Sequence, residues 1–561
     1  MLQQAWQAPA FDVVVIGGGI NGIGVFRDLA LQGVRVLIVE RADFCSGASA
    51  ASSHMVHGGI RYLENGEFRL VKEAVVERNR LIENAPHYVK PLATNIPIFA
   101  TFSGLLNAPL KFLNLLNRPS ERGALVIKFG LMMYDAFTRK QGTVPKHTFV
   151  RRDKALRQYP QLNSQIKYLA TYYDAMMPSP ERLALEVLMD GVNEQTGAIA
   201  LNYVSAVGAA GDQVQLRDEI SGETFHVRAR LVVNAAGPWI DVVNRELGEA
   251  TQFIGGTKGS HIVLDHPLLK EAIGEREFFF ENDDGRIVLI FPLLHRVMVG
   301  TSDILIENPD DARCTDEEVA YFFDLVRRIF PDVSLSRTDI VYRFSGVRPL
   351  PASDAATAGQ ISRDHSIMVL QPSETNLAFP VYNLIGGKWT TFRAFAEKVT
   401  DEALALLDVK RARGTESLAI GGGLRYPDDA AGQENWVRQL AERHGLPLER
   451  ARTLFDRYGT RASKVADYIA QRHDSPLRHH AGYSRREIEF LAACEMVVHL
   501  DDLLQRRTLV AIMGETTQPL LEELAEVVGQ ICGWSQEKHT AEIERTQQIF
   551  AAKFQPFPEN T

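Results

Sequence analysis

The stretch that decides the fold is residues 13–40, VVVIGGGINGIGVFRDLALQGVRVLIVE. It begins with a short apolar run, Val13 to Ile16, which is typical of a buried strand. A glycine-rich turn follows, then a segment with the apolar spacing of a helix, and then a second strand expected over Val34 to Val39. We therefore predict a strand–helix–strand unit at the start of the chain.

The turn after the first strand has the spacing G-x-G-x-x-G. Its glycines are Gly17, Gly19 and Gly22, and Ile20 and Asn21 lie between the last two. The first glycine permits the tight turn, the second lets the backbone approach a pyrophosphate, and the third lets the helix pack on the strand. Glu40 follows the last glycine by 18 positions, where a carboxylate accepts hydrogen bonds from an adenosine ribose. This loop predicts a dinucleotide site but does not choose between FAD and NAD.

Small residues follow the second strand. Residues 46–53 read SGASAASS, and His57, Gly58 and Gly59 come soon after them. The hydroxyl groups suit an extended cofactor, and the two glycines leave room for a flat ring. A flexible Ser/Ala loop is the plain alternative, and this segment alone does not decide between the two interpretations.

Size and charge limit the classes of protein to consider. The chain has 561 residues, more than one hydrophobic core usually organises, so two or three domains are expected. Hydrophobic residues make up 45% and charged residues 23%, as in ordinary globular proteins. The formal net charge of -9 argues against a general nucleic-acid binder, because neutralising phosphates requires clustered Lys and Arg.

The cysteines and the first ten residues indicate in which cellular compartment the protein is expected. Four widely separated cysteines form neither a CxxC pair nor a disulfide-like framework; they are Cys45, Cys314, Cys494 and Cys532. The first ten residues lack the pattern of a secretory signal, and no run of about twenty apolar residues follows. We therefore expect a cytoplasmic protein that lies on a membrane surface if it meets a membrane at all.

The sequence pattern of the chain changes near residue 420. Before about residue 410 strand-like and helical runs alternate, with strands expected at Leu231 to Ala235 and Ile287 to Phe291. A glycine connector, Gly421 to Gly423, precedes a region in which Glu, Arg, Leu and Ala recur at helical spacing from about Pro427. We predict interleaved cofactor-binding and substrate-binding domains over residues 1–410, a linker over 411–426 and a C-terminal helical cap domain over 427–561.

Several uncommon strings occur in order along nearly the whole chain. They are Ser52-Ser53, His57-Gly58-Gly59-Ile60-Arg61-Tyr62-Leu63, Glu67-Phe68-Arg69-Leu70-Val71, Lys258-Gly259-Ser260-His261, Gly300-Thr301-Ser302-Asp303, Ser345-Gly346-Val347-Arg348-Pro349-Leu350, Ser362-Arg363-Asp364, Gly386-Gly387-Lys388-Trp389-Thr390-Thr391 and Asp501-Asp502-Leu503-Leu504-Gln505-Arg506-Arg507-Thr508. Through these strings the chain resembles the FAD-dependent glycerol-3-phosphate dehydrogenases. The resemblance implies an α/β fold with a Rossmann-like FAD-binding domain, a mixed-sheet substrate domain and a C-terminal helical domain.

The resemblance also implies a reaction. It is FAD-dependent oxidation of sn-glycerol 3-phosphate to dihydroxyacetone phosphate by hydride transfer to flavin N5, with the electrons passed to a membrane quinone. Such a site must hold a phosphate and stabilise a developing alkoxide, and both needs call for positive groups. The substrate-binding residues that the resemblance implies are Arg61, Tyr62, Arg348, Arg363 and Lys388. We assign Arg61 and Arg363 mainly to the phosphate and Arg348 to the substrate hydroxyl.

The chemistry is assigned to Arg348, His261 and Lys388. His261 is able to take the hydroxyl proton at neutral pH, while cationic neighbours lower the cost of the alkoxide. A structural role explains His261 and His57 equally well. The residues that the resemblance brings to FAD, besides the first glycine loop and Glu40, are Ser52, Ser53, His57, Gly58, Gly59, Gly237, Gly387, Lys388 and Thr390. We predict no metal ligand.

Two of these cofactor contacts lie in turns. Gly237 follows the strand that begins at Leu231, where a turn brings the backbone near the cofactor in related flavoproteins. Gly387 lies in a glycine turn ahead of a segment with helical periodicity, Phe392 to Leu407. A helix start has free N–H groups and a partial positive charge, which would stabilise the anionic N1/O2 edge of reduced flavin. A plain helix start is the alternative.

Residues 91–116 combine apolar side chains with nearby basic ones, including Lys111, Arg118 and Lys128. This pattern suits a surface that dips into anionic lipid, and an ordinary core helix explains it nearly as well. The resemblance favours peripheral attachment to the inner face of the cell membrane. We also expect that the C-terminal domain supports a homodimer.

Three alternatives remain open at this point. A glycerol-3-phosphate oxidase would use the same substrate residues but pass electrons to oxygen and release hydrogen peroxide. An enzyme for an amino or hydroxy acid would share the fold, yet such sites recognise a carboxylate with fewer positive groups. A non-catalytic flavin-binding module, the alternative from another class, would lack a substrate pocket, whereas each proposed basic residue is present in the sequence.

Overall fold

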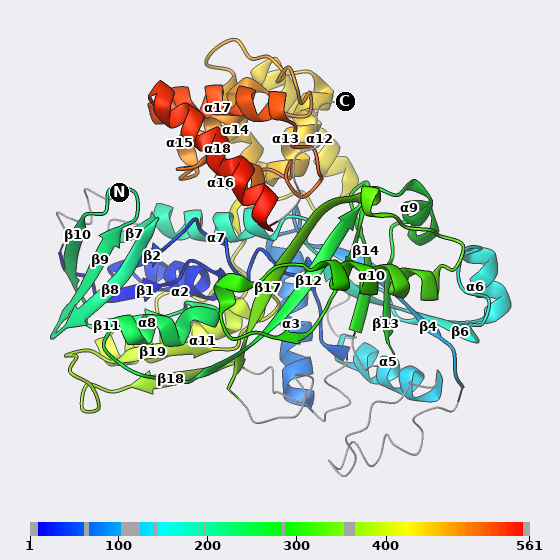
Figure 1. The fold of residues 1–561 in the computed structure, drawn as a ribbon, viewed down its shortest axis with the longest axis horizontal. Helices are drawn as coiled ribbons and strands as arrows, with labels where there is room; N and C mark the ends of the chain where they lie inside the picture. The colour runs from blue at the N-terminus through cyan, green and yellow to red at the C-terminus, as the bar shows by residue number, and fades with distance from the viewer. Residues whose placement is uncertain are drawn as a thin grey trace.

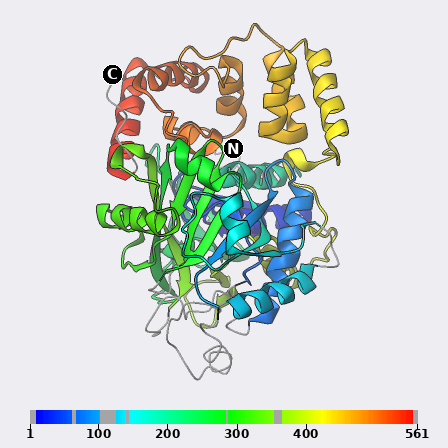
Figure 2. The same ribbon diagram turned by 90° about the vertical axis from the view of Figure 1, so that its right-hand side faces the viewer.

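The computed structural model of the chain describes residues 9–60, 67–101, 124–138, 143–194, 197–282, 287–352 and 365–553. They form two large β-sheets and a small three-stranded sheet, with helices around them and a separate group of helices at the C-terminal end. In Figures 1 and 2 these C-terminal helices form a layer at the top of the molecule, above both sheets. The predicted α/β fold with a C-terminal helical region is confirmed.

The first sheet contains the strand–helix–strand unit that the sequence predicts. Strand β1 lies between β2 and β11 and is parallel to both. The sheet order is β18 (Ser366–Leu370), β19 (Val381–Ile385), β11 (Leu231–Asn234), β1 (Val13–Ile16), β2 (Val36–Glu40) and β7 (Ala198–Asn202). Only the edge pair β18 and β19 is antiparallel among the pairs described in this sheet.

The first sheet is buried on both faces, as a parallel sheet is expected to be. Val13 and Val15 point to one face, and the alternating residues Val14 and Ile16 point to the other. The first face is covered by the helices α2 (Ile20–Leu31), α7 (Pro180–Glu194) and α11 (Phe392–Leu407). The second face is covered by α8 (Ile240–Glu246) and a three-stranded sheet, β8 (Val204–Ala210), β9 (Gln213–Asp218) and β10 (Thr224–Arg228).

The second sheet has ten strands and mixed directions. Along its main path the order is β16 (Ile304–Leu305), β12 (Ile254–Leu264), β15 (Arg296–Gly300), β14 (Ile287–Leu293), β13 (Glu277–Glu281), β4 (Lys90–Ile98), β6 (Tyr168–Met176) and β3 (Met55–Val56). Two further strands, β17 (Ile340–Pro351) and β5 (Thr148–Arg151), pair with β12 and β6. The helices of this part are α3 (Phe68–Asn84), α5 (Ala124–Thr138), α6 (Arg152–Gln158), α9 (Pro267–Ile273) and α10 (Asp316–Ile329).

The C-terminal helices share a hydrophobic core with the second sheet. Side chains of β12, β14 and β17, such as Val263, Phe291 and Phe344, pack in one cluster with Leu454 and Leu524 of the helices. The helices are α12 (Ala430–His444), α13 (Leu448–Tyr458), α14 (Ala462–Ile469), α15 (Arg485–Cys494), α16 (Leu500–Asp502), α17 (Gln518–Cys532) and α18 (Gln536–Lys553), with a π-helical turn at Leu503–Arg507. The domain boundaries at residues 410 and 427 stay a prediction.

The glycine connector packs closely against the rest of the molecule. Gly421 to Gly423 form a short 3-10 turn, and a Cβ atom on Gly422 would lie 1.9 Å from the carbonyl oxygen of Tyr458. A Cβ atom on Gly423 would lie 2.3 Å from the carbonyl oxygen of Asn84. These glycines are therefore needed because backbone approaches backbone there, and not because the connector is a loose tether.

The segment expected to contact lipid is divided by the structure. Residues 91–98 belong to strand β4, where Ile96 and Ile98 are buried, so this part does not face lipid. These apolar residues are those of a core strand. Basic residues nearby in the sequence do not distinguish a core strand from a segment that contacts lipid. Residues 102–116 lie outside the described residues. Among the helices that the structure describes, none is both long and apolar enough to cross a bilayer.

Candidate active site

The glycine loop between β1 and α2 is packed so tightly that side chains cannot be added. Gly17 has φ +109°, and a Cβ atom there would lie 2.6 Å from the carbonyl oxygen of Ala235. A Cβ atom on Gly22 would lie 2.0 Å from the carbonyl oxygen of Gly17. Helix α2 can therefore start directly beside the turn, which directs its first N–H groups toward the space at the carboxyl end of β1.

Glu40 ends β2 beside this loop, as the sequence predicts. Its carboxylate accepts hydrogen bonds from the backbone N–H groups of Gly18, at 2.7 Å, and Ala42, at 3.0 Å. Burial raises the pKa of Glu40, although both backbone bonds favour the charged form. Glu40 therefore holds the glycine loop, and its contact with a ribose stays a prediction.

The small-residue segment lies across the start of helix α2. Ser49 Oγ accepts a hydrogen bond from the N–H group of Ile20 at 2.9 Å, and the Ser49 carbonyl accepts one from Trp389 Nε1 at 2.8 Å. Thr390 Oγ1 donates to the carbonyl of His57 at 3.1 Å. This segment is thus bonded to both glycine-rich turns, which the chain separates by more than 300 residues.

The second glycine turn meets the first one directly. Asn21 Nδ2 donates to the carbonyl of Gly386 at 3.5 Å, and a Cβ atom on Gly387 would lie 2.3 Å from Asn21 Nδ2. Lys388 follows in the same turn and is half-buried. Helix α11 begins at Phe392, so the predicted helix start follows this turn by several residues. Gly237, with φ +58°, opens a 3-10 turn after β11.

His261 and Arg348 come from the paired strands β12 and β17. His261 Nε2 lies 2.8 Å from Ser53 Oγ, and its ring stacks on Phe344 at a centroid distance of 5.0 Å. Burial, with the nearby positive charge of Arg348 and the ring of His54, lowers the pKa of His261 to about 3. His261 is therefore neutral throughout the physiological range.

Arg348 is held in place by groups that follow β15. Its guanidinium donates to Asp303 Oδ1 at 3.0 Å, to Thr301 Oγ1 at 2.9 Å and to the Ser302 carbonyl at 3.2 Å. A Cβ atom on Gly259 would lie 2.4 Å from one nitrogen of this guanidinium, so the side chain lies across the β12 backbone. Arg348 is 24% exposed, which leaves it accessible to a ligand.

The residues of the neighbouring string Lys258-Gly259-Ser260-His261 have different structural roles. Lys258 is buried and donates to Glu318 Oε2 at 2.8 Å and to the Arg313 carbonyl at 2.6 Å. The Ser260 N–H group donates to Ser302 Oγ at 2.9 Å. Lys258 and Ser260 therefore tie β12 to α10 and to the turn that orients Arg348.

A buried network that the sequence did not indicate supports the His57–Gly59 segment. Asp174 Oδ1 accepts hydrogen bonds from the Gly58 N–H group at 2.9 Å, from Arg78 at 3.0 Å and from Tyr134 Oη at 2.5 Å. A Cβ atom on Gly58 would lie 2.1 Å from Tyr134 Oη. The three polar side chains come from separate elements, so nothing in the local pattern marks them as partners of a cofactor segment.

Three of the predicted substrate residues are not placed by the structure: Arg61, Tyr62 and Arg363 lie outside the described residues. Among the other predicted site residues, the structure joins Ser53 to His261 and His57 to Thr390. The roles assigned to the site residues stay predictions.

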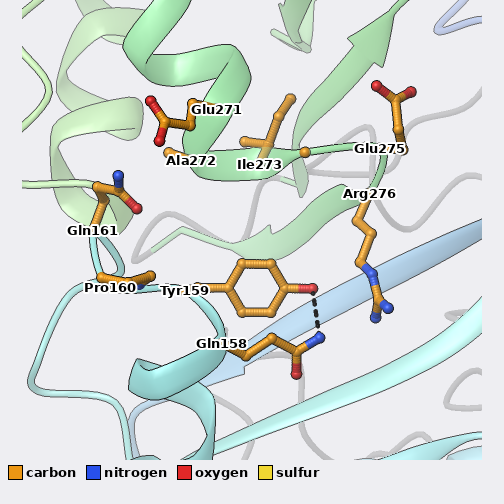
Figure 3. A pocket seen from close by; sticks show the side chains of 10 residues that line it. Gln158, Tyr159, Pro160, Gln161, Glu271, Ala272, Ile273, Glu275 and Arg276 are labelled. Atoms are coloured by element: carbon orange, nitrogen blue, oxygen red, sulfur yellow. Dashed lines mark hydrogen bonds between the residues drawn. The ribbon is translucent and has the colours of Figure 1, made fainter.

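A surface pocket of about 410 Å³ lies elsewhere. It is formed by residues around the ends of α6 and α9, and Tyr159 and Arg276 face it from opposite sides (Figure 3). Both helices lie on the side of the molecule away from β1 and α2 (Figure 1). This pocket therefore takes no part in the site built around the glycine loops.

The described residues fit FAD. Gly17, Gly19 and Gly22 add no side chains of their own to the turn before α2, where a pyrophosphate requires close access to the backbone. The buried Asn21 Oδ1 has no hydrogen-bond partner among the described residues, between the two glycine turns. A mainly parallel sheet with this loop, joined to a mixed sheet that carries Arg348, is the arrangement of an FAD-binding oxidoreductase.

Comparisons with known proteins identify the family. The model of the FAD dependent oxidoreductase family matches residues 12–377, and that of the C-terminal domain of alpha-glycerophosphate oxidase matches residues 413–539. A glycerol-3-phosphate dehydrogenase of Synechocystis is 32% identical, with 96% of each chain covered. One of Pseudomonas aeruginosa is 31% identical over 91% of this chain and 94% of its own. The chain belongs to the glycerol-3-phosphate dehydrogenase family of FAD-dependent oxidoreductases, and its cofactor is FAD.

Two further comparisons bear on fold and substrate. The glycerol-3-phosphate dehydrogenase of Bacillus halodurans, solved with FAD, superposes with a TM-score of 0.75 at 23% identity, covering 98% of this chain and 97% of its own. That similarity concerns the fold alone. A D-erythritol 1-phosphate dehydrogenase of Brucella abortus is 32% identical, over 89% of this chain and 94% of its own. Relatives at the same level of identity therefore differ in the polyol phosphate that names them.

Proposed function

We propose that the protein oxidises sn-glycerol 3-phosphate to dihydroxyacetone phosphate and passes the electrons to a quinone. The observation that carries this proposal is the pairing of strands β12 and β17, which brings a neutral His261 and a cationic Arg348 to one site. That site adjoins the segment that is bonded to both cofactor turns. The names of the relatives from Synechocystis and Pseudomonas aeruginosa support the choice of substrate.

Arg348 binds the substrate hydroxyl in this proposal. Its guanidinium is oriented by Asp303 and Thr301, so little side-chain freedom is lost when a ligand oxygen binds. FAD, when bound, supplies the acceptor for the hydride that leaves carbon 2, at flavin N5. As the hydroxyl proton departs, a fixed positive charge stabilises the negative charge that develops on the oxygen. Lys388, with Arg61 and Arg363, completes the basic pocket for the phosphate.

His261 takes the hydroxyl proton in the proposed reaction. It is neutral because burial and Arg348 disfavour its charged form, so a nitrogen is available as an acceptor above pH 3. The contact between His261 Nε2 and Ser53 Oγ fixes the orientation of the ring. A dianionic substrate adds negative charge beside the imidazole and so raises its proton affinity when the substrate is bound.

The quinone acceptor and a lipid surface are part of the same proposal. Helix α5 carries Leu125, Phe129 and Met132 on one face, and they are 47%, 65% and 55% exposed. Lys128 lies beside them, as in surfaces that enter anionic lipid. This face supports peripheral attachment to the inner side of the cell membrane, where a quinone is dissolved. The homodimer stays a prediction.

The test is an anaerobic titration of the FAD-loaded protein. Glycerol 3-phosphate should bleach the flavin stoichiometrically, and D-erythritol 1-phosphate at matched concentration should do so more slowly. Faster bleaching by the erythritol compound would move the assignment to the longer polyol phosphate that names the Brucella abortus relative. No bleaching by either compound would leave the non-catalytic flavin module as the better description.

The acceptor is tested by reoxidising the reduced protein. We expect a soluble quinone to restore the flavin absorbance faster than air does, with little hydrogen peroxide. Rapid and stoichiometric peroxide in air, without acceleration by quinone, would contradict the proposed acceptor and favour a glycerol-3-phosphate oxidase.

A further inference from the structure

The segment from Glu40 to Cys45 is hydrogen-bonded to the first glycine loop at both of its ends. Glu40 accepts the hydrogen bond of the Gly18 N–H group at 2.7 Å, and the Cys45 N–H group donates to the Gly18 carbonyl at 2.8 Å. This segment, the Glu40–Cys45 segment, therefore fixes both the N–H group and the carbonyl group of Gly18 in the loop. After Glu40, which ends β2, the segment lies outside the strands and needs other contacts to keep its shape.

Those contacts come from the opposite end of the chain. Asp43 is fully buried, and its carboxylate accepts hydrogen bonds from Arg506 Nε at 2.5 Å and from both terminal nitrogens of Arg507 at 2.5 and 2.9 Å. Asn202 adds a fourth bond at 3.0 Å. Although burial disfavours the charged carboxylate, Arg507 and Arg506 hold the pKa of Asp43 down at about 2. Asp43 is therefore ionised and saturated with donors.

Both arginines are held by the C-terminal helices as well. Arg507 donates to the backbone carbonyls of Glu495 and Met496 at 2.8 and 3.3 Å. Arg506 donates to Asp502 at 2.6 Å and also pairs with Asp501. They are adjacent in a π-helical turn, Leu503–Arg507, which makes both guanidiniums available to one carboxylate. The C-terminal region thus presents a rigid pair of cations to Asp43.

We infer that Arg506 and Arg507 are positioning residues for the cofactor. They hold Asp43, Asp43 fixes the Glu40–Cys45 segment, and that segment orders the glycine loop before FAD binds. Ordering a binding loop in advance removes a cost that binding would otherwise have to meet, so affinity rises without a direct contact to the ligand. The C-terminal helices would then influence the adenosine end of the cofactor site through their ion pairs with Asp43. They would not need to contact the flavin ring.

The test uses the full-length protein stripped of flavin. Arg507→Met removes the charge at similar length, Arg507→Lys keeps the charge but loses the planar fork, and Asp43→Asn removes the acceptor charge. The matched control is Glu487→Gln. Glu487 is another fully buried carboxylate with bonds from Arg450, Arg457 and Tyr458, and all of these lie within the C-terminal helices.

Two measurements are made on each variant: the dissociation constant of FAD, from flavin fluorescence, and the unfolding midpoint of the flavin-free protein. We expect Arg507→Met and Asp43→Asn to weaken FAD binding by about tenfold or more, or about 1.4 kcal/mol, and Arg507→Lys by an intermediate factor. Glu487→Gln should lower the unfolding midpoint but change FAD affinity by less than about twofold.

Two results would overturn the inference. One is FAD affinity within about twofold of the parent in the soluble Arg507 variants, with Arg507→Lys deciding if Arg507→Met does not fold. The other is an equal loss of affinity in Glu487→Gln, because the effect would then follow general stability. Neither measurement depends on turnover, so the inference fails or stands apart from the proposed reaction.

Discussion

Replacement of Arg348 by Ala tests the proposed chemistry most directly. The guanidinium has three hydrogen bonds to the turn after β15, and its ion pair with Asp303 is partly exposed. Such a pair contributes at most about 1 kcal/mol to stability, so the folded protein and its bound FAD should survive the change. Loss of one donor to a developing oxyanion usually slows a reaction by roughly 10²–10³-fold. We expect anaerobic flavin reduction by glycerol 3-phosphate to slow by that factor.

The assay is stopped-flow measurement of flavin absorbance after mixing with substrate under anaerobic conditions. Arg343→Ala is the matched control, because Arg343 lies on the same strand, is 29% exposed and pairs with the surface carboxylate of Asp316. It should reduce its flavin at the parent rate. Reduction in Arg348→Ala within about threefold of the parent, with FAD bound, would refute the role of Arg348, since a transition-state contact is worth far more.

Three further predictions concern cofactor, pH and stability. Gly22→Ala should purify without FAD, judged by the flavin-to-protein absorbance ratio, because the new Cβ would lie 2.0 Å from the Gly17 carbonyl oxygen. His261 has a pKa of about 3 in the folded protein against 6.5 ordinarily, so the unfolded chain takes up its proton first as the pH falls. Stability should be lost between about pH 6.5 and 3, and less steeply in His261→Gln, as measured by unfolding midpoints across that window. Asp174→Asn leaves the buried charge of Arg78 uncompensated beneath Gly58. Denaturant unfolding should show that the free energy of unfolding falls by about 3–5 kcal/mol.

Local features of the cofactor unit could be predicted from sequence because they depend on local physics. The glycine spacing, the apolar run of β1 and the acidic residue that ends β2 all follow from a turn that must bring a helix against a strand. Helix α11 runs from Phe392 to Leu407 as its apolar periodicity indicates. Strand β2 begins at Val36, two residues after the expected start, since Val34 packs in the core without joining the ladder.

The contacts between distant segments could not be predicted. His261 meets Ser53 across 208 residues, and Asp43 meets Arg507 across 464. Neither pair has a spacing or a pattern of its own, because each depends on how the two sheets and the C-terminal helices stack. The resemblance indicated strings such as His57-Gly58-Gly59, whereas their partners, such as Asp174 beneath Gly58, are found only when the strands are paired.

The pairing of Asp43 with Arg507 also determines when the cofactor loop can be completed during biosynthesis. A ribosome adds about 5–20 residues per second, so the 464 residues between them take roughly 25–90 s to appear. During that interval the nascent chain contains the glycine loop but not the cations that fasten its neighbouring segment. Strand β19, which is needed for the first sheet, also emerges late, at Val381–Ile385. FAD therefore meets the finished site only after Arg507 has been synthesised.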